Sequence, residues 1–189
     1  MNLFINAVSE SGVFIIFNSD RKIIARENIQ VLGNESSKLI GLLDSFLSAN
    51  NISYYDLENI VVVSGPGSFT GIRTISLIVN TINYVIKKNI TDINYFDLFK
   101  NYPICKPSSK RDTFIKKGQD YDIEVIQNPD LINYFDLNNI SEIYGELNPT
   151  FFDKIKALDE IDYESIIGEI KFKKNSQIRP LYIKKPSIT

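Results

Sequence analysis

The chain has 189 residues, 43% of them hydrophobic, and a formal net charge of −2. This length allows a sizeable core in one domain or two small ones, and the charge provides no overall attraction to nucleic acid or a membrane. Histidine is absent and Cys105 is the single cysteine, which excludes histidine-based catalysis, a structural zinc site within one chain and an intramolecular disulfide. The sequence has neither a signal-peptide pattern nor a membrane-length apolar run, so we expect a cytoplasmic protein without a membrane partner. We also expect neither a bound metal nor a cofactor.

The first hundred residues predict an α/β unit. Apolar runs at 3–7, 13–17 and 23–25, separated by turn residues, indicate three strands at hairpin spacing. The pattern then predicts a helix, a strand, a second helix and a strand, at Glu35–Ala49, 56–63, 71–88 and 93–96. The order β-β-β-α-β-α-β indicates a mixed sheet, and it resembles the ribonuclease-H-like unit of actin-like proteins and sugar kinases.

The second half predicts a smaller, reduced α/β subdomain, with domains at 1–102 and 103–189 and a boundary near Pro103. Strands are expected at 104–105, 114–115 and 123–125, and helices at 129–135 and 149–158, each helix with a proline in its first turn. The basic stretch from Lys171 to Lys185 is read as a solvated tail, with direct contact to RNA as the alternative.

The segment Ser64–Arg73 joins the fourth strand to the second helix and carries three glycines. Glycine allows close backbone approach, Thr70 is placed as an N-cap, and the first free N–H groups of a helix can bind an anion. However, the segment has no lysine after Gly71 as a G-x-x-x-x-G-K-[ST] loop would, it does not match G-x-G-x-x-G, and Phe69 is bulky. These departures favour a structural loop over a phosphate site and leave both open.

The second helix has more apolar surface than packing on a sheet requires, because such a helix needs a stripe about 100° wide. Two interpretations follow: the helix faces the sheet and another protein, or it is buried between the sheet and the second half of its own chain. The stripe contains Ile75, Ile78, Val79, Ile82, Val85 and Ile86, and Ile72, Leu77 and Tyr84 add apolar groups beside it.

The segment Gly65–Arg73 resembles a specific signature, Gly-Pro-Gly-Ser-Phe-Thr-Gly-Leu-Arg, of the TsaB (YeaZ) family. These bacterial proteins are needed to make threonylcarbamoyladenosine in tRNA. The preceding Asp56–Ile60 and the polar trio Asn34–Ser36 agree with the family's context, although the trio lacks the family's usual histidine. The resemblance is good over residues 1–100 and faint beyond, where Lys110–Phe114 and Pro180–Pro186 match weakly. The candidate site residues of the signature loop are Gly65, Pro66, Gly67, Ser68, Phe69, Thr70, Gly71 and Arg73.

The resemblance implies a non-catalytic member of the actin-like ATPase superfamily. Such a protein binds and activates the catalytic paralogue TsaD as a heterodimer, the ATPase TsaE joins the complex, and tRNA is contacted only indirectly. The implied interface uses the helices Glu35–Ala49 and Gly71–Lys88, which can also pair two copies when the partner is missing. The partner-binding residues expected on these helices are Leu39, Leu43, Ile75, Ile78, Val79, Ile82 and Ile86.

One departure bears on catalysis. Active actin-like ATPases keep an aspartate in the first hairpin loop, where this chain has Asn6. A neutral amide holds Mg²⁺ poorly, because hard cations prefer carboxylate oxygen. We therefore expect no catalytic residues, and we keep a small ATP-binding kinase or ATPase of the same fold as the alternative.

Overall fold

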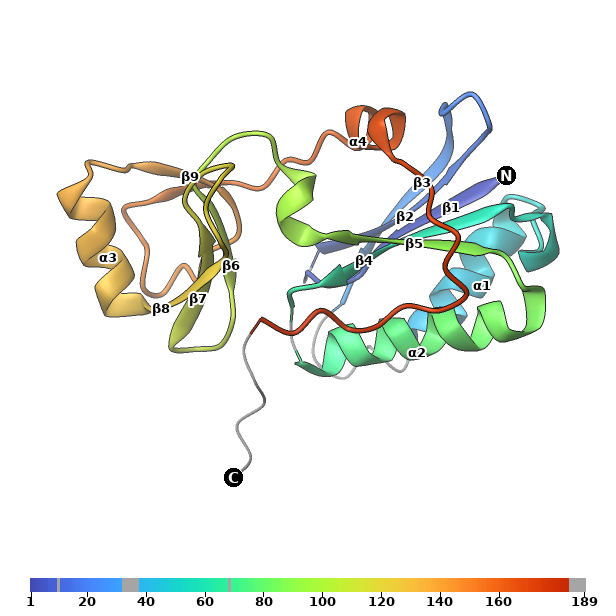
Figure 1. Ribbon diagram of the computed structural model, residues 1–189, viewed down its shortest axis with the longest axis horizontal. Helices are drawn as coiled ribbons and strands as arrows, with labels where there is room; N and C mark the ends of the chain where they lie inside the picture. The colour runs from blue at the N-terminus through green and yellow to red at the C-terminus, as the bar shows by residue number, and fades with distance from the viewer. Residues whose placement is uncertain (10, 32–37, 68, 184–189) are drawn as a thin grey trace. The chain divides into compact units, whose positions relative to one another are not determined.

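A computed structural model describes residues 1–189 except 10, 32–37, 68 and 184–189 (Figure 1). The polar trio Asn34–Ser36, Ser68 and the basic residues Lys184 and Lys185 therefore lie outside the described residues. The chain forms two compact units. The first contains Met1–Tyr95 and Tyr163–Leu181, and the second contains Phe96–Asp162 and, of its last segment, the described residues Tyr182 and Ile183.

The first unit is built on a five-stranded mixed sheet with the order β3-β2-β1-β4-β5. Strand β1 is antiparallel to β2 and parallel to β4, β2 is antiparallel to β3, and β4 is parallel to β5. This arrangement confirms the mixed sheet and the predicted element order. The strands are β1 (Asn2–Asn6), β2 (Ser11–Phe17), β3 (Ile23–Gln30), β4 (Asn59–Gly65) and β5 (Asn89–Asn94). The helices are α1 (Leu39–Ala49), α2 (Phe69–Ile86) and α4 (Tyr163–Glu169), with a 3-10 turn η2 at Tyr54–Asp56.

Helices cover both faces of this sheet, as Figure 1 shows for α1 and α2 on one side and α4 on the other. The apolar runs of β1 and β4 are buried along almost their whole length, as expected for central strands covered on both faces. Successive side chains of a strand point to opposite faces, so Leu3 and Ile5 join the core beneath α1 and α2. Phe4 lies on the other face, where its ring meets Tyr163 of α4 edge-on at a centroid distance of 5.5 Å.

The second unit is built on its own five-stranded sheet, with the order β10-β9-β6-β7-β8. One helix, α3 (Asn128–Leu137), packs on it through Leu131 and Phe135. Along the chain, the 3-10 turn η3 (Tyr95–Leu98) begins at the last residue of the first unit's first segment and continues into the second unit. The strands are β6 (Ile104–Pro107), β7 (Asp112–Lys116), β8 (Glu124–Gln127), β9 (Glu142–Gly145) and β10 (Lys156–Leu158).

Four expectations about the elements need correction. The helix expected at 149–158 is wrong, because this stretch makes turns and then strand β10, which pairs with β9 through Lys156 and Glu142. The last strand of the first sheet begins four residues earlier than expected, at Asn89. Helix α2 begins at Phe69, so Thr70 lies inside its first turn and not at the N-cap. The short helix α4 was not predicted, because seven residues carry little periodic signal.

The division of the chain also differs from the expected boundary at Pro103. Residues 163–181 return to the first unit after Phe96–Asp162 of the second unit. The last part of this return, residues 173–181, has no regular secondary structure beyond one bridge, Ile90 to Asn175, and we call it the C-terminal strap. Its hydrogen bonds join it to β5, α2 and the end of β4. Figure 1 shows the strap running alongside α2.

Within the described part of the chain, no helix has both the length and the apolar character that crossing a bilayer requires.

Candidate functional site

The glycine loop is packed tightly by its own chain. A Cβ atom on Gly67 would lie 2.9 Å from the carbonyl oxygen and 3.0 Å from the Cβ of Val8, in the turn that follows β1. A Cβ on Gly65 would lie 2.9 Å from the carbonyl oxygen of Leu181, and Gly65 has a φ of 136°, which L side chains rarely adopt. Because neither glycine has a Cβ atom, the backbone at Val8 and at Leu181 can pack directly against the loop.

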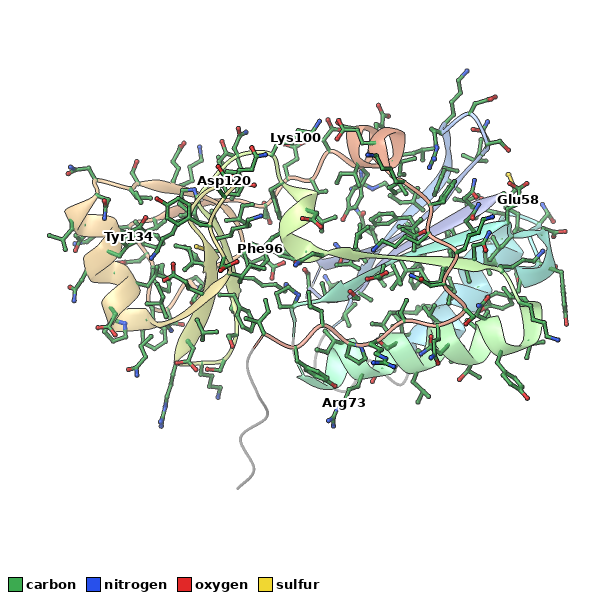
Figure 2. All side chains as sticks on the ribbon, in the orientation of Figure 1. Glu58, Arg73, Phe96, Lys100, Asp120 and Tyr134 are labelled. Atoms are coloured by element: carbon green, nitrogen blue, oxygen red, sulfur yellow. The ribbon has the colours of Figure 1, made fainter. Side chains whose placement is uncertain are left out.

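The strap closes one side of the loop. The backbone N–H of Leu181 donates to the carbonyl oxygen of Ser64, at 3.0 Å. Pro66 is buried and Gly67 is half-buried between Val8 and the first turn of α2. Gly71 and Arg73 follow in that turn, and Figure 2 shows the exposed Arg73 side chain projecting away from the helix. The loop thus connects β4, the first hairpin and the strap.

Asn6, the residue that stands where the resemblance to actin-like ATPases leads us to expect an aspartate, has a structural role. Asn6 is fully buried at the end of β1. Its Nδ2 donates to the hydroxyl of Tyr163 at 3.2 Å, and its Oδ1 accepts from the backbone N–H of Val8 at 3.4 Å. The amide therefore links the first hairpin to α4, and both ends of the side chain are used in doing so.

Most of the expected partner-binding residues lie in the core of this chain. Leu39, Leu43, Ile75 and Val79 are at most 3% exposed, and Ile86 is 9% exposed. They pack against the sheet together with Leu3, Ile5 and Val62. The core alone accounts for the burial of these five side chains, which are not at the surface of the first unit.

The remaining apolar groups of the two helices are more exposed. Ile78 and Ile82 are partly buried at the edge of the core, while Leu77 is 68% and Val85 is 59% exposed. Ile78, Ile82 and Val85 recur at i, i+4 and i+7, which places them along one side of α2. We call these three residues, together with Leu77, the apolar flank; Leu77 lies about 100° further round the helix from Ile78. On α1, Ile40 is also exposed, at 43%.

The other side of α2 holds the strap through two asparagines. Asn80 uses both ends of its amide on Ile178: Nδ2 donates to the carbonyl oxygen at 3.0 Å, and Oδ1 accepts from the backbone N–H at 2.9 Å. Asn83 is buried, and its Nδ2 donates to the carbonyl oxygen of Ser176 at 2.9 Å. Sequence analysis missed both residues. In the sequence they are two asparagines three residues apart beside an apolar stripe. That pattern does not indicate a function unless the position of the strap is known.

The single thiol and the carboxylates do not form a metal-binding cluster among the residues that the structure describes. Cys105 is fully buried in the core of the second unit, and burial raises the pKa of its thiol far above the usual range. A buried neutral thiol is a poor nucleophile and a poor metal ligand. Over the same described residues, no three Cys, Asp or Glu side chains lie close enough together to bind a metal ion.

Comparison with known proteins agrees with this geometry. A family model described as TsaD, tRNA N6-adenosine threonylcarbamoyltransferase, matches residues 32–100, which include α1, β4, the glycine loop and α2. Comparison with curated proteins finds no match. The similar solved structures include the following two. One is an uncharacterized protein with similarity to peptidase YeaZ from Pseudomonas aeruginosa: TM-score 0.70, 11% identity, covering 97% of this chain and 99% of that one. The other is YeaZ from Pseudomonas aeruginosa: TM-score 0.51, 10% identity, covering 66% and 63%.

The chain is therefore an α/β protein with the fold of YeaZ structures, consistent with the actin-like, ribonuclease-H-like class. The family match over residues 32–100 includes the Gly65–Arg73 segment that carries the TsaB (YeaZ) resemblance.

Proposed function

We propose that this protein is a non-catalytic subunit that binds and activates a TsaD-type partner for threonylcarbamoyl transfer to adenosine of tRNA. The observation that carries the proposal is the match of residues 32–100 to a threonylcarbamoyltransferase family, over the segment that contains the signature loop and both candidate interface helices. A TsaE-type ATPase would join the larger complex, and the isolated chain would pair with a second copy.

The exposed side of α2 supports a protein partner. The apolar flank leaves Leu77 and Val85 more than half exposed, and Ile40 of α1 adds a further exposed apolar group. Contiguous exposed apolar side chains are typical of interaction surfaces, and Ile78, Ile82 and Val85 recur along one side of α2. The proposal therefore moves the partner contact from the buried stripe, which the chain's own sheet covers, to the apolar flank.

The packing of the loop supports a non-catalytic role over the kinase or ATPase alternative. In a phosphate loop, glycines leave room for the ligand to approach the backbone. Here the space beside Gly67 and Gly65 is filled by Val8 and Leu181 of the same chain. The amide of Asn6 is already bonded to Tyr163, and a neutral amide offers a divalent cation less than a carboxylate does.

The test is co-elution with a TsaD-type protein in size-exclusion chromatography. Val85→Glu and Leu77→Glu place a charge on the apolar flank and should abolish the complex without unfolding the chain, because both side chains are exposed. Leu137→Glu is the matched control, since Leu137 is 83% exposed at the end of α3 in the second unit. A wild-type chain that does not co-elute, or flank variants that bind like the control, would contradict the proposal.

The alternative has a separate test. Isothermal titration of the wild-type chain with ATP and Mg²⁺ should give no heat of binding at millimolar nucleotide. Saturable binding would favour the kinase or ATPase function instead.

A further inference from the structure

An open depression, lined mostly by polar residues, lies between the end of α2 and the C-terminal strap. Its volume is about 990 Å³, and it is lined by residues from positions 80–89 and 174–177. Three of its lining residues are lysines, Lys87, Lys88 and Lys174, and none is acidic. In a chain with a net charge of −2, this is a local concentration of positive charge. We call it the lysine groove.

The charges of the lysine groove are not neutralised by the described part of the chain. No ion pair joins Lys87, Lys88 or Lys174 to a carboxylate there. Asp92 of β5, which the strap approaches, is engaged by Lys173, whose Nζ lies 3.1 Å from its Oδ1, and by Nδ2 of Asn175 at 3.2 Å. The groove therefore presents three positive groups to solvent, as an anion-binding surface requires.

The groove is held in shape by a buried side chain. Asn83, which is 3% exposed, donates to the carbonyl oxygen of Ser176 on the strap and accepts from the backbone N–H of Lys88 at 2.8 Å. Lys87 adopts a positive φ of 54° directly after α2 and thereby turns the chain out of the helix. One asparagine thus fixes both walls, so the lysines from two distant parts of the sequence are brought together by the fold.

An aromatic side chain stands at the rim. Tyr84 lines the groove and is 84% exposed, the highest exposure among the large apolar and aromatic side chains described in the chain. Exposed aromatic rings beside basic side chains are how proteins bind single-stranded nucleic acid, because bases stack on the ring while the cations contact the phosphates. The amides of Asn89 and Gln177 add hydrogen-bonding groups to the lining.

We propose that the lysine groove binds single-stranded RNA, with phosphates on Lys87, Lys88 and Lys174 and a base against Tyr84. An anionic membrane fits less well, because Tyr84 is the only aromatic or aliphatic residue in the lining and gives no apolar face to insert. The proposal extends the proposed function, since it adds a direct RNA contact to a subunit of a tRNA-modifying complex. RNA binding by the isolated chain does not require the partner, so the two proposals fail independently.

The experiment is a fluorescence anisotropy titration of the full chain with a labelled single-stranded oligouridylate and with unmodified tRNA, at several salt concentrations. The triple variant Lys87→Gln, Lys88→Gln, Lys174→Gln should lose at least about tenfold in affinity for both probes, and the slope of log K against log salt should fall by about 2 for the single strand, at roughly 0.7 per phosphate contact. Tyr84→Ala should lose about tenfold, which corresponds to one stacked base.

Matched controls keep the charge and the aromatic arguments separate. Lys22→Gln combined with Lys154→Gln removes two exposed lysines elsewhere, and Tyr55→Ala removes a tyrosine that is 67% exposed on η2. These variants should bind like the wild type. Equal losses in test and control variants, or no RNA binding by the wild type, would overturn the proposal. So would tighter binding to free nucleoside triphosphate or to vesicles containing phosphatidylserine than to the oligouridylate.

Discussion

The side-chain amide of Asn6 donates a hydrogen bond to the hydroxyl of Tyr163, 3.2 Å away, across 157 residues of sequence. The first residue ends β1, and the second begins α4, after Phe96–Asp162 of the second unit. Both side chains are buried, so the bond is formed away from water. It ties the returning segment to the strand next to the glycine loop.

Removing the hydroxyl tests this link. Tyr163→Phe keeps the ring contact with Phe4 but leaves the buried amide of Asn6 without its acceptor. The unpaired donor should lower the free energy of unfolding by about 1–3 kcal/mol. Urea unfolding followed by circular dichroism measures the change, and Tyr55→Phe, at an exposed tyrosine, should leave the midpoint unchanged.

Alanine substitutions at two glycines distinguish the effect of steric packing on stability from the effect of helix propensity. Gly67→Ala places a Cβ 2.9 Å from the carbonyl oxygen of Val8, and this overpacking should destabilise the protein by about 1–3 kcal/mol. Gly41→Ala, in the first turn of α1, meets no atom within 4 Å and should stabilise by up to about 1 kcal/mol. Thermal unfolding of both variants decides the point. A stable Gly67→Ala protein would mean that Val8 does not pack on the loop.

The strap should open when Asn80 is shortened. Asn80→Ala removes both hydrogen bonds to Ile178, at about 1 kcal/mol each, so the open state should become roughly 5- to 30-fold more populated. Limited trypsin digestion should then cut faster after Lys173 and Lys174, with mass spectrometry identifying the site. Thr81→Ala, at the exposed neighbouring residue of α2, is the control. Unchanged cleavage would show that Asn80 does not hold the strap.

Cys105 should resist alkylation in the folded protein. Burial disfavours its thiolate and raises the pKa of the thiol above its ordinary value, so iodoacetamide should react only after denaturation. A group whose pKa is raised on folding contributes stability below its unfolded pKa, about 8.5 for a thiol, and loses it as the pH rises further. The wild type should therefore lose stability above about pH 8.5 more steeply than Cys105→Ala does. Parallel slopes would contradict this.

The first unit was predictable because its signals are local. Continuous apolar runs such as Ile60–Val63 identify central strands, and the stripe through Ile75 and Val79 identifies the buried side of α2. An apolar stripe does not by itself show whether that side of the helix packs on its own sheet or on another protein. Five of the seven residues expected at an interface are core residues. Their role in partner binding stays a prediction.

The returning segment was not predictable, because its structure depends on distant partners. Helix α4 has only seven residues. The strap is held by hydrogen bonds to Asn80, Asn83 and Thr91, and such bonds leave no periodic pattern in the sequence. The short strand β10 is similar: Lys156–Leu158 is extended because β9 lies beside it, whereas Pro149 and the residues after it read as a helix start. Tertiary pairing overrides local preference in such short elements.

The return of Tyr163–Leu181 has a consequence for how the protein is made. The first unit is interrupted between Tyr95 and Tyr163, so a nascent chain displays its glycine loop and sheet before the residues that cover them have been synthesised. At translation rates of about 5–20 residues per second, that interval lasts several seconds. During it, the backbone at Ser64 and the amides of Asn80 and Asn83 await their partners, and the compact second unit can form first.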